Sequence, residues 1–329
     1  MRLRNFGTTD LKVSELCLGT MGFGWTTDER SAFAVMDAFV EAGGNFLDTA
    51  DVYSFWVPGH RGGEAEEIIG RWLKARGSRD RLVIATKVRG RMWEGPDGEG
   101  LSRSHIERAV RDSLRRLQVE SIDLYQCHWP DDNTPIEETL AVFAELIDSG
   151  KVRYVGASNF PPTQLDAALK VAKEERLPRF VSLQPPYNLV RRAEFEKELA
   201  PICQREGLAV IPYGPLASGF LTGKYRQGQP LPESQRAEYT RDTKGFTRAA
   251  ASFMTEQGFA VVAALENVAR AHGTTVGAAA LAWLLAKPVV TAPIIGVNSQ
   301  EQLADLLPAV EIHLRSDELD LLDAASAGM

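Results

Sequence analysis

Short apolar runs rich in β-branched residues alternate with amphipathic helical stretches along almost the whole chain, and this alternation limits the possible folds more than any other feature. No change of composition marks a second domain. We expect eight strands, at Leu16–Leu18, Asn45–Asp48, Leu82–Lys87, Ile122–His128, Val152–Ser158, Phe180–Gln184, Ala209–Tyr213 and Val290–Ile295. Eight β-then-α units predict an α/β fold, a closed (β/α)₈ (TIM) barrel formed as a single domain over residues 1–329.

The helices and the irregular segments can be placed by local signals. Ser102 is a candidate N-cap for a helix that carries Ile106 and Val110 on one face. A second helix is expected at Ile136–Asp148. Residues 2–15 predict an N-terminal β-hairpin that closes the bottom of the barrel. The insertion Ser54–Gly63 and the polar stretch 225–257 are expected to be long loops on the opposite, C-terminal face, closing over substrate and cofactor.

Charge and composition exclude several classes of function. The formal net charge of −7 argues against nucleic acid or an anionic membrane as a partner, since either requires a basic face. The N-terminus has no apolar signal segment, and the longest nearly apolar run, Val276 to Ala286, is too short to span a bilayer. The three cysteines, Cys17, Cys127 and Cys203, form no CxxC pair and are interpreted as core residues. We therefore expect a cytoplasmic protein.

Polar side chains stand at or just after the C-terminal end of almost every predicted strand. Those following strands two to seven are Asp48, Lys87, His128, Ser158, Asn159, Gln184 and Tyr213, and Gly296 follows the eighth. In an α/β barrel the active site is built at this rim. The pattern therefore predicts a functional site there.

Three of these rim residues, together with Tyr53 five positions after Asp48, suit the reduction of a carbonyl group by hydride, which requires a proton to be delivered to oxygen. Tyr53 is the candidate acid, because a phenol holds its proton at neutral pH. Lys87 would lower its pKa, and Asp48 would anchor the lysine. His128 would donate a hydrogen bond to the carbonyl oxygen. Each residue alone has an ordinary structural explanation, such as a cap or a packed ring; their joint placement on strands two, three and four favours catalysis.

The motifs around these residues resemble the aldo-keto reductase family, from about residue 3 to about residue 310. The matching stretches include LGTMGFG, NFLDTADVY, GGEAEEIIGRWL, VIATK, DLYQCHWPDDNTPIEETL, GKVRYVGASNF, LQPPYNL and IPYGPLASGFLTGKY. The resemblance implies a (β/α)₈ barrel that usually binds NADP(H) without a Rossmann domain. It also implies that Asp48, Tyr53, Lys87 and His128 are the catalytic tetrad.

The same resemblance implies a cofactor site. Ser158, Asn159 and Gln184 would bind the nicotinamide carboxamide, and Tyr213 would stack on the ring. The loop over the pyrophosphate would run from Gly214 to Lys224, where glycines let backbone N–H groups approach phosphate oxygens and the lysine adds charge. Further cofactor contacts are expected at Gly19, Thr20, Met21, Asp48, Pro215, Leu216, Ser218, Gly219 and Gly296.

The adenosine end departs from the family pattern. Members commonly place Arg or Lys two residues after the glycine that follows strand eight, to meet the 2′-phosphate, and this chain has Asn298 there. Asn298, Ser299 and Gln302 could still hydrogen-bond a phosphate or a ribose hydroxyl, and Asp305 the adenine. The loss of a charge-assisted contact weakens strict NADPH preference. We expect NADPH or NADP⁺, with NADH as the alternative.

The substrate is less constrained by the sequence. Trp25, Trp56 and Trp129 follow strands one, two and four and would form an apolar wall beside Tyr53 and His128. We expect a small-molecule carbonyl substrate, with sugar-like carbonyls among the candidates. The histidines His105, His272 and His313 lack ligand spacing, so no metal is expected.

Two other functions remain open. One is an NAD-dependent alcohol or sugar dehydrogenase that uses the same site in reverse. The other is a nucleotide-sensing regulatory subunit, since some relatives in the family serve membrane channels. The oligomeric state is not determined by the sequence, and a monomer agrees with many members of the family.

Overall fold

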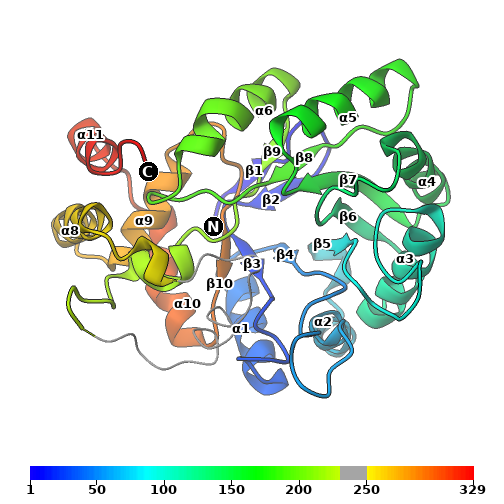
Figure 1. Ribbon diagram of the computed structural model, residues 1–329. Helices are drawn as coiled ribbons and strands as arrows, with labels where there is room; N and C mark the ends of the chain where they lie inside the picture. Colours follow the sequence, from blue (N-terminus) through cyan, green and yellow to red (C-terminus); the bar gives the residue numbers. More distant parts are fainter. Residues whose placement is uncertain (230–249) are drawn as a thin grey trace.

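The structure, a computed structural model, describes residues 1–229 and 250–329, and Figure 1 shows strands at the centre with helices around them. Within these ranges eight parallel strands pair in the order β10-β3-β4-β5-β6-β7-β8-β9. The strands are β3 (Cys17–Gly19), β4 (Phe46–Asp48), β5 (Val83–Val88), β6 (Ile122–Cys127), β7 (Val152–Ser158), β8 (Ser182–Gln184), β9 (Ala209–Val210) and β10 (Ile294–Gly296). The predicted (β/α)₈ fold is confirmed, and most predicted strand ends lie within two residues of the observed ones.

The last two strands are shorter than predicted. We expected Ala209–Tyr213, but β9 ends at Val210, and β10 begins four residues after Val290. The two segments still meet, because Val210 forms a parallel bridge with Val290 and its carbonyl accepts from Thr291 N at 2.8 Å. Pro212 and Pro293 lack the N–H that a regular ladder requires, so the sheet closes here through isolated hydrogen bonds.

Helices follow the strands and cover the outside of the sheet (Figure 1). They are α1 (Glu29–Glu41), α2 (Glu64–Arg76), α3 (Arg103–Leu117), α4 (Ile136–Asp148), α5 (Pro162–Glu174), α6 (Ala200–Glu206), α8 (Glu256–Ala271), α9 (Val276–Leu285), α10 (Gln300–Leu306) and α11 (Ser316–Ala325). The Ser102 hydroxyl accepts from His105 N and caps α3 as predicted. Ile106 and Val110 are buried on the inner face of α3, and α4 has the predicted bounds.

The N-terminal hairpin closes the end of the barrel opposite the rim. It consists of β1 (Leu3–Asn5) and β2 (Lys12–Ser14), which pair antiparallel. The turn between them lies at the starts of β8 and β9, where the Gly7 Cα has the carbonyls of Val181 and Gly207 beside it. Phe6 packs edge-on against Phe46 with ring centroids 5.6 Å apart, inside the core cluster that fills the barrel. The predicted hairpin is therefore confirmed.

The other features named from the sequence are only partly described. The three cysteines are buried thiols, as core residues should be. Loop Ser54–Gly63 folds back so that Gly63 N donates to Tyr53 O at 3.1 Å. Of the long segment 225–257, residues 230–249 lie outside the described residues, so its predicted closure over the site stays a prediction. No helix in the described part of the chain has the length and apolar character needed to cross a membrane.

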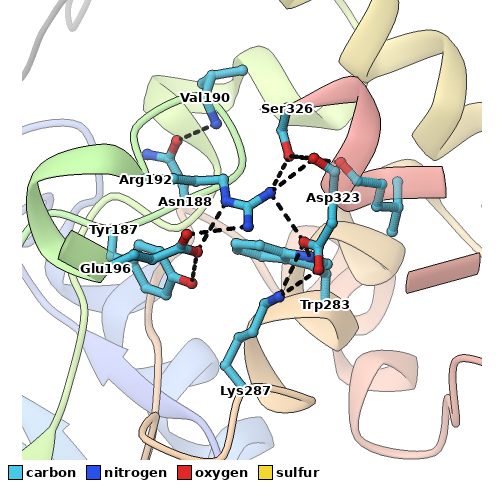
Figure 2. A network of polar contacts seen from close by, with 10 residues as sticks. Tyr187, Asn188, Val190, Arg192, Glu196, Trp283, Lys287, Asp323 and Ser326 are labelled. Atoms are coloured by element: carbon cyan, nitrogen blue, oxygen red, sulfur yellow. Dashed lines mark hydrogen bonds and ion pairs between the residues drawn. The ribbon is translucent and has the colours of Figure 1, made fainter. Parts of the chain in front are cut away.

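Arg192 ties the C-terminal helix to the barrel (Figure 2). Its guanidinium donates to both carboxylate oxygens of Glu196, at 2.9 and 3.1 Å, and to the Ser326 hydroxyl at 2.6 Å. It also pairs with the Asp323 carboxylate at 3.0 Å and lies over the ring of Trp283. The side chain is 13% exposed, so the network is largely shielded from water.

We expect Arg192→Ala to lower the free energy of unfolding by about 1–2 kcal/mol, because Glu196 loses its only guanidinium partner among the described residues and Asp323 keeps Lys287 and Trp283. Urea unfolding followed by circular dichroism measures the effect. Arg103→Ala is the matched control, since Arg103 pairs with Glu107 and Glu145 on the surface and its loss should barely move the midpoint. Equal midpoints for both variants would contradict a structural role for the Arg192 network.

Candidate active site

Lys87 joins Asp48 and Tyr53 at the rim of the barrel. It belongs to β5, and Asp48 ends the neighbouring strand β4. The fully buried Lys87 Nζ lies 2.6 Å from Asp48 Oδ1, 2.7 Å from Thr49 O and 2.9 Å from the Tyr53 hydroxyl. All three ammonium donors therefore have partners. Burial alone would lower the lysine pKa, but the Asp48 carboxylate and Tyr53 outweigh it and raise the pKa above its ordinary value.

The electrostatics of Tyr53 differ from the sequence expectation. Burial of the phenol raises its pKa, Lys87 lowers it and Asp48 raises it again, so that the pKa stays above its ordinary value. The lysine therefore moderates the effect of burial rather than bringing the pKa down toward neutrality. Tyr53 holds its proton through the physiological range.

The second carboxylate oxygen of Asp48 is bound by two amides. Gln184 Nε2 lies 2.9 Å from Asp48 Oδ2, and Gln126 Nε2 lies 3.2 Å from it. Gln184 Nε2 also lies 3.3 Å from Gln126 Oε1. Because both carboxylate oxygens are held, Asp48 presents a fixed orientation to Lys87.

His128 lies one residue beyond the end of β6, and its ring is near Tyr53. The two ring centroids are 5.9 Å apart, and His128 stacks on Trp129 at 3.7 Å. Burial, reinforced by the cations of Lys87 and Arg89, lowers the pKa of His128 well below its ordinary value. The imidazole is therefore neutral near pH 7, with one ring N–H available as a donor.

A hydrogen-bonded chain connects His128 to the other side of the cavity. Asn159 Nδ2 donates to the His128 carbonyl at 2.9 Å, and the Tyr213 hydroxyl donates to Asn159 Oδ1 at 2.8 Å. Asn159 adopts a left-handed backbone conformation, with φ 58°, which an asparagine tolerates. Ser158 Oγ donates to the backbone carbonyl of Gln184 at 2.9 Å. These contacts give the rim a fixed polar surface next to the four catalytic candidates.

Asp48, Tyr53, His128, Asn159, Gln184 and Tyr213 all line one cavity of about 1130 Å³. A pocket for one drug-sized ligand measures about 300–1000 Å³, so this cavity has room for a large ligand together with a small one. The sequence-predicted residues that line it are Gly19, Met21, Trp25, Asp48, Tyr53, Trp56, His128, Trp129, Ser158, Asn159, Gln184, Tyr213, Gly214, Pro215, Leu216, Ser218, Gly219, Lys224, Gly296, Asn298, Gln302 and Asp305.

Three predicted site residues lie outside the lining. Lys87 is beneath the floor, where it contacts Tyr53. The buried Thr20 hydroxyl donates to the Asp48 carbonyl at 3.0 Å, so it supports β4. Ser299 uses its hydroxyl to accept from Gln302 N at the start of α10.

The loop predicted to hold the pyrophosphate combines glycine, left-handed backbone and a cation. Gly214, Ala217, Ser218 and Gly219 all have φ between 49° and 84°. The Lys224 ammonium lies against Gly219, since a Cβ added there would meet Nζ at 2.8 Å, and the φ of 84° favours glycine at this position. Backbone turned in this way, with a cation beside it, suits the binding of phosphate oxygens.

The segment predicted to meet the adenosine carries the uncharged Asn298 at the position where a cation was expected from the family resemblance. Asn298 Oδ1 accepts from the hydroxyls of Thr26 and Thr27 at 3.0 and 2.8 Å, and Asn298 N donates to Gln302 Oε1 at 2.8 Å. The cationic side chains that line the cavity among the described residues are Arg89, Arg91 and Lys224, none of them in this segment. The polar groups predicted for a 2′-phosphate are thus already partly engaged with one another.

The aromatic wall predicted for the substrate does form. Trp25 and Trp56 meet edge-to-face with centroids 5.6 Å apart, and Trp56 lies 6.3 Å from Tyr53. Trp129 completes the wall through its stacking on His128. The wall places apolar surface beside the Tyr53 hydroxyl and the imidazole.

The family model that matches this chain is that of the aldo/keto reductase family, over residues 15–327. The chain belongs to the aldo/keto reductase family. The resemblance noted from the motifs is thereby confirmed, and it extends over nearly the whole chain.

Relatives of this aldo/keto reductase carry different names. The chain is 38% identical to "Uncharacterized oxidoreductase YrpG" of Bacillus subtilis, over 98% of this chain and 95% of the relative. It is 34% identical to "Probable voltage-gated potassium channel subunit beta" of rice, over 95% and 92%. It is 32% identical to "L-glyceraldehyde 3-phosphate reductase" of Escherichia coli, over 99% and 96%. The family includes enzymes and a named channel subunit at similar identity, so substrate must be argued from the site.

Sequence reasoning missed several residues of the site, and two of them are close in sequence to predicted ones. Gln126 lies two positions before His128, and Arg89 lies two positions after Lys87. Residues two apart in a strand point to the same face, so this spacing was an available signal. A third omission is the buried contact of Glu66 with Arg116 Nε, at 2.7 Å, and with Thr86 Oγ1, at 2.6 Å, which holds α2 against α3 and β5. Glu66, Arg116 and Thr86 are far apart in the sequence, and only the packed structure brings them together.

Proposed function

We propose that this aldo/keto reductase reduces aldehydes and ketones to alcohols with NADPH as the coenzyme. The observation that carries the proposal is the Tyr53 hydroxyl, which lies 2.9 Å from Lys87 Nζ and faces a cavity that His128 also lines. The nicotinamide, when bound, supplies a hydride to the carbonyl carbon. The protein must then deliver a proton to the oxygen and hold it in place.

Each of the four residues has a distinct part in the proposed reaction. Tyr53 donates its proton to the carbonyl oxygen. Neutral His128 donates a hydrogen bond to the same oxygen and sets its direction. The Lys87 ammonium stabilises the phenolate that forms when Tyr53 loses its proton, and Asp48 keeps the lysine in position. The burial of all four strengthens these charge interactions.

The residues present fit a nicotinamide dinucleotide. Ser158, Asn159 and Gln184 would hold the carboxamide, Tyr213 would stack on the ring, and Lys224 with its glycine-containing loop would bind the pyrophosphate. Asn298 and Gln302 would meet the adenosine ribose or its 2′-phosphate. We also propose that residues 1–329 form one domain. The protein would act in the cytoplasm on a small carbonyl substrate.

The uncharged segment around Asn298 favours a second candidate, an NAD-dependent alcohol or sugar dehydrogenase that uses the same site. Quenching of tryptophan fluorescence by NADPH and NADH separates the two, since three tryptophans line the cavity. With neutral hydrogen bonds in place of a cation, we expect NADPH to bind about fivefold to tenfold more tightly than NADH. Equal or tighter binding of NADH would favour the dehydrogenase.

A third candidate is a nucleotide-sensing regulatory subunit, because the rice relative is named as a probable channel subunit. An enzyme of this type should turn over at about 1 s⁻¹ or faster with a good carbonyl substrate. Tight binding of NADPH with only a single slow turnover, across a panel of aldehydes and ketones, would favour the nucleotide-sensing alternative.

A further inference from the structure

Arg89 is a charged residue of the cavity to which the proposed mechanism gives no part. It directly follows β5, two residues beyond Lys87. Its carbonyl accepts from Gly100 N at 3.0 Å, and the preceding Val88 carbonyl accepts from His128 N at 2.9 Å. Its backbone has φ 126°, a conformation that side chains other than glycine rarely adopt. Strain of this kind is concentrated at functional sites, where the surrounding structure maintains it.

Arg89 lines the same cavity as His128 and Trp129, and its charge acts on the His128 imidazole. Its Nε is buried and has no hydrogen-bond partner among the described residues. The nearest carboxylate oxygen, Glu99 Oε2, lies 4.0 Å from Arg89 Nη1, which is the outer limit of an ion pair. A buried N–H without a partner is costly, so the position is suited to an acceptor that arrives from the cavity.

The carboxylates near Arg89 already have other partners. Glu99 Oε1 lies 2.5 Å from Arg91 Nη2. Asp131 accepts from Leu101 N, Asn133 N and the Thr134 hydroxyl, at 2.8 to 3.1 Å. Among the described residues at this part of the cavity lining, Arg89, Arg91 and Glu99 together leave one positive charge, since Asp48 is paired with Lys87 and His128 is neutral.

We propose that Arg89 determines substrate specificity by binding an anionic group, a carboxylate or a phosphate, on the aldehyde or ketone whose carbonyl oxygen meets Tyr53 and His128. A guanidinium matches either anion with two parallel N–H donors. The proposal rests on the proposed reductase activity and adds the class of substrate. Orientation by the anion would fix the carbonyl relative to Tyr53.

The test compares matched neutral and anionic aldehydes with NADPH. Butanal is paired with 4-oxobutanoate for the carboxylate, and glyceraldehyde with its 3-phosphate for the phosphate. We expect the wild type to prefer at least one anionic compound in kcat/KM by about tenfold or more. In Arg89→Met this preference should fall by about tenfold or more, to near parity with the neutral compound, mostly through KM for the anion. The pair that shows the larger loss identifies the anion.

Three further variants make the test decisive. Arg89→Gly also removes the guanidinium but adopts φ 126° without strain, so it separates charge from folding. Glu99→Gln should increase the anion preference, since it removes the nearest competing carboxylate. Arg103→Met, on the outer surface, removes one positive charge from the protein and should leave the preference as in the wild type.

The outcomes separate this inference from the proposed function. Turnover of neutral and anionic aldehydes with equal kcat/KM, or an unchanged preference in both Arg89 variants, would overturn the role of Arg89 and leave the reductase proposal intact. No turnover of any of the four aldehydes, despite tight binding of NADPH, would overturn the reductase proposal itself.

Discussion

Tyr53→Phe is expected to lower kcat for carbonyl reduction by about 10³- to 10⁴-fold, because general acid catalysis by a positioned side chain contributes up to this amount. The substitution removes one oxygen and leaves the ring packed between Trp56 and His128. The affinity for NADPH should therefore be retained. Steady-state oxidation of NADPH measures kcat, and fluorescence quenching measures binding.

Tyr154→Phe is the matched control for this loss. Its hydroxyl donates to Asp10 at 2.7 Å at the hairpin end of the barrel, far along β7 from the rim. We expect this variant to turn over like the wild type. If Tyr53→Phe does so as well, Tyr53 is not the acid, and another group must supply the proton.

Lys87→Met is expected to have the second largest effect, on both activity and stability. The variant leaves the Asp48 carboxylate buried without its cation, which should cost about 3–5 kcal/mol in the free energy of unfolding. It also removes the charge that stabilises the Tyr53 phenolate, so kcat should fall by about 10²- to 10³-fold. Urea unfolding and NADPH oxidation measure the two losses separately.

The double variant Asp48→Asn/Lys87→Met distinguishes the structural from the chemical part of this effect. Removal of both charges should restore much of the stability, because no uncompensated carboxylate remains. Activity should stay low, since the ammonium is still absent. Recovery of activity together with stability would show that Lys87 has only a structural role.

The pH dependence provides a further readout of the Lys87 variant. Burial raises the pKa of Tyr53, so reduction should be independent of the phenol through neutral pH and fall only as Tyr53 loses its proton at strongly alkaline pH. Lys87 opposes the effect of burial, so without it the pKa should rise further. The alkaline fall of kcat/KM should therefore move to higher pH in Lys87→Met. A shift toward neutral pH would contradict this account.

The strands could be predicted from the sequence wherever a continuous apolar run coincides with regular pairing. The run Val152–Ser158 has the observed bounds of β7, since both of its ends pair in register, Val152 with β6 and Ser158 with β8. The prediction was less accurate at Ala209–Tyr213, because Pro212 interrupts the ladder while the chain continues in an extended direction. The hydrophobic pattern indicates which residues are buried. It does not indicate whether the backbone N–H of each residue forms a hydrogen bond in the sheet.

The sequence by itself determined the barrel and its rim, because parallel strands bring their C-terminal ends to one edge whatever the details of packing. It also predicted that Asp48, Tyr53, Lys87 and His128 meet at this rim. Only the tertiary structure decided how these groups are charged. It buries Tyr53 enough to outweigh Lys87, keeps His128 neutral, and holds Glu99 closer to Arg91 than to Arg89. Desolvation and hydrogen bonding depend on distances between segments far apart in the chain, and no local pattern encodes those distances.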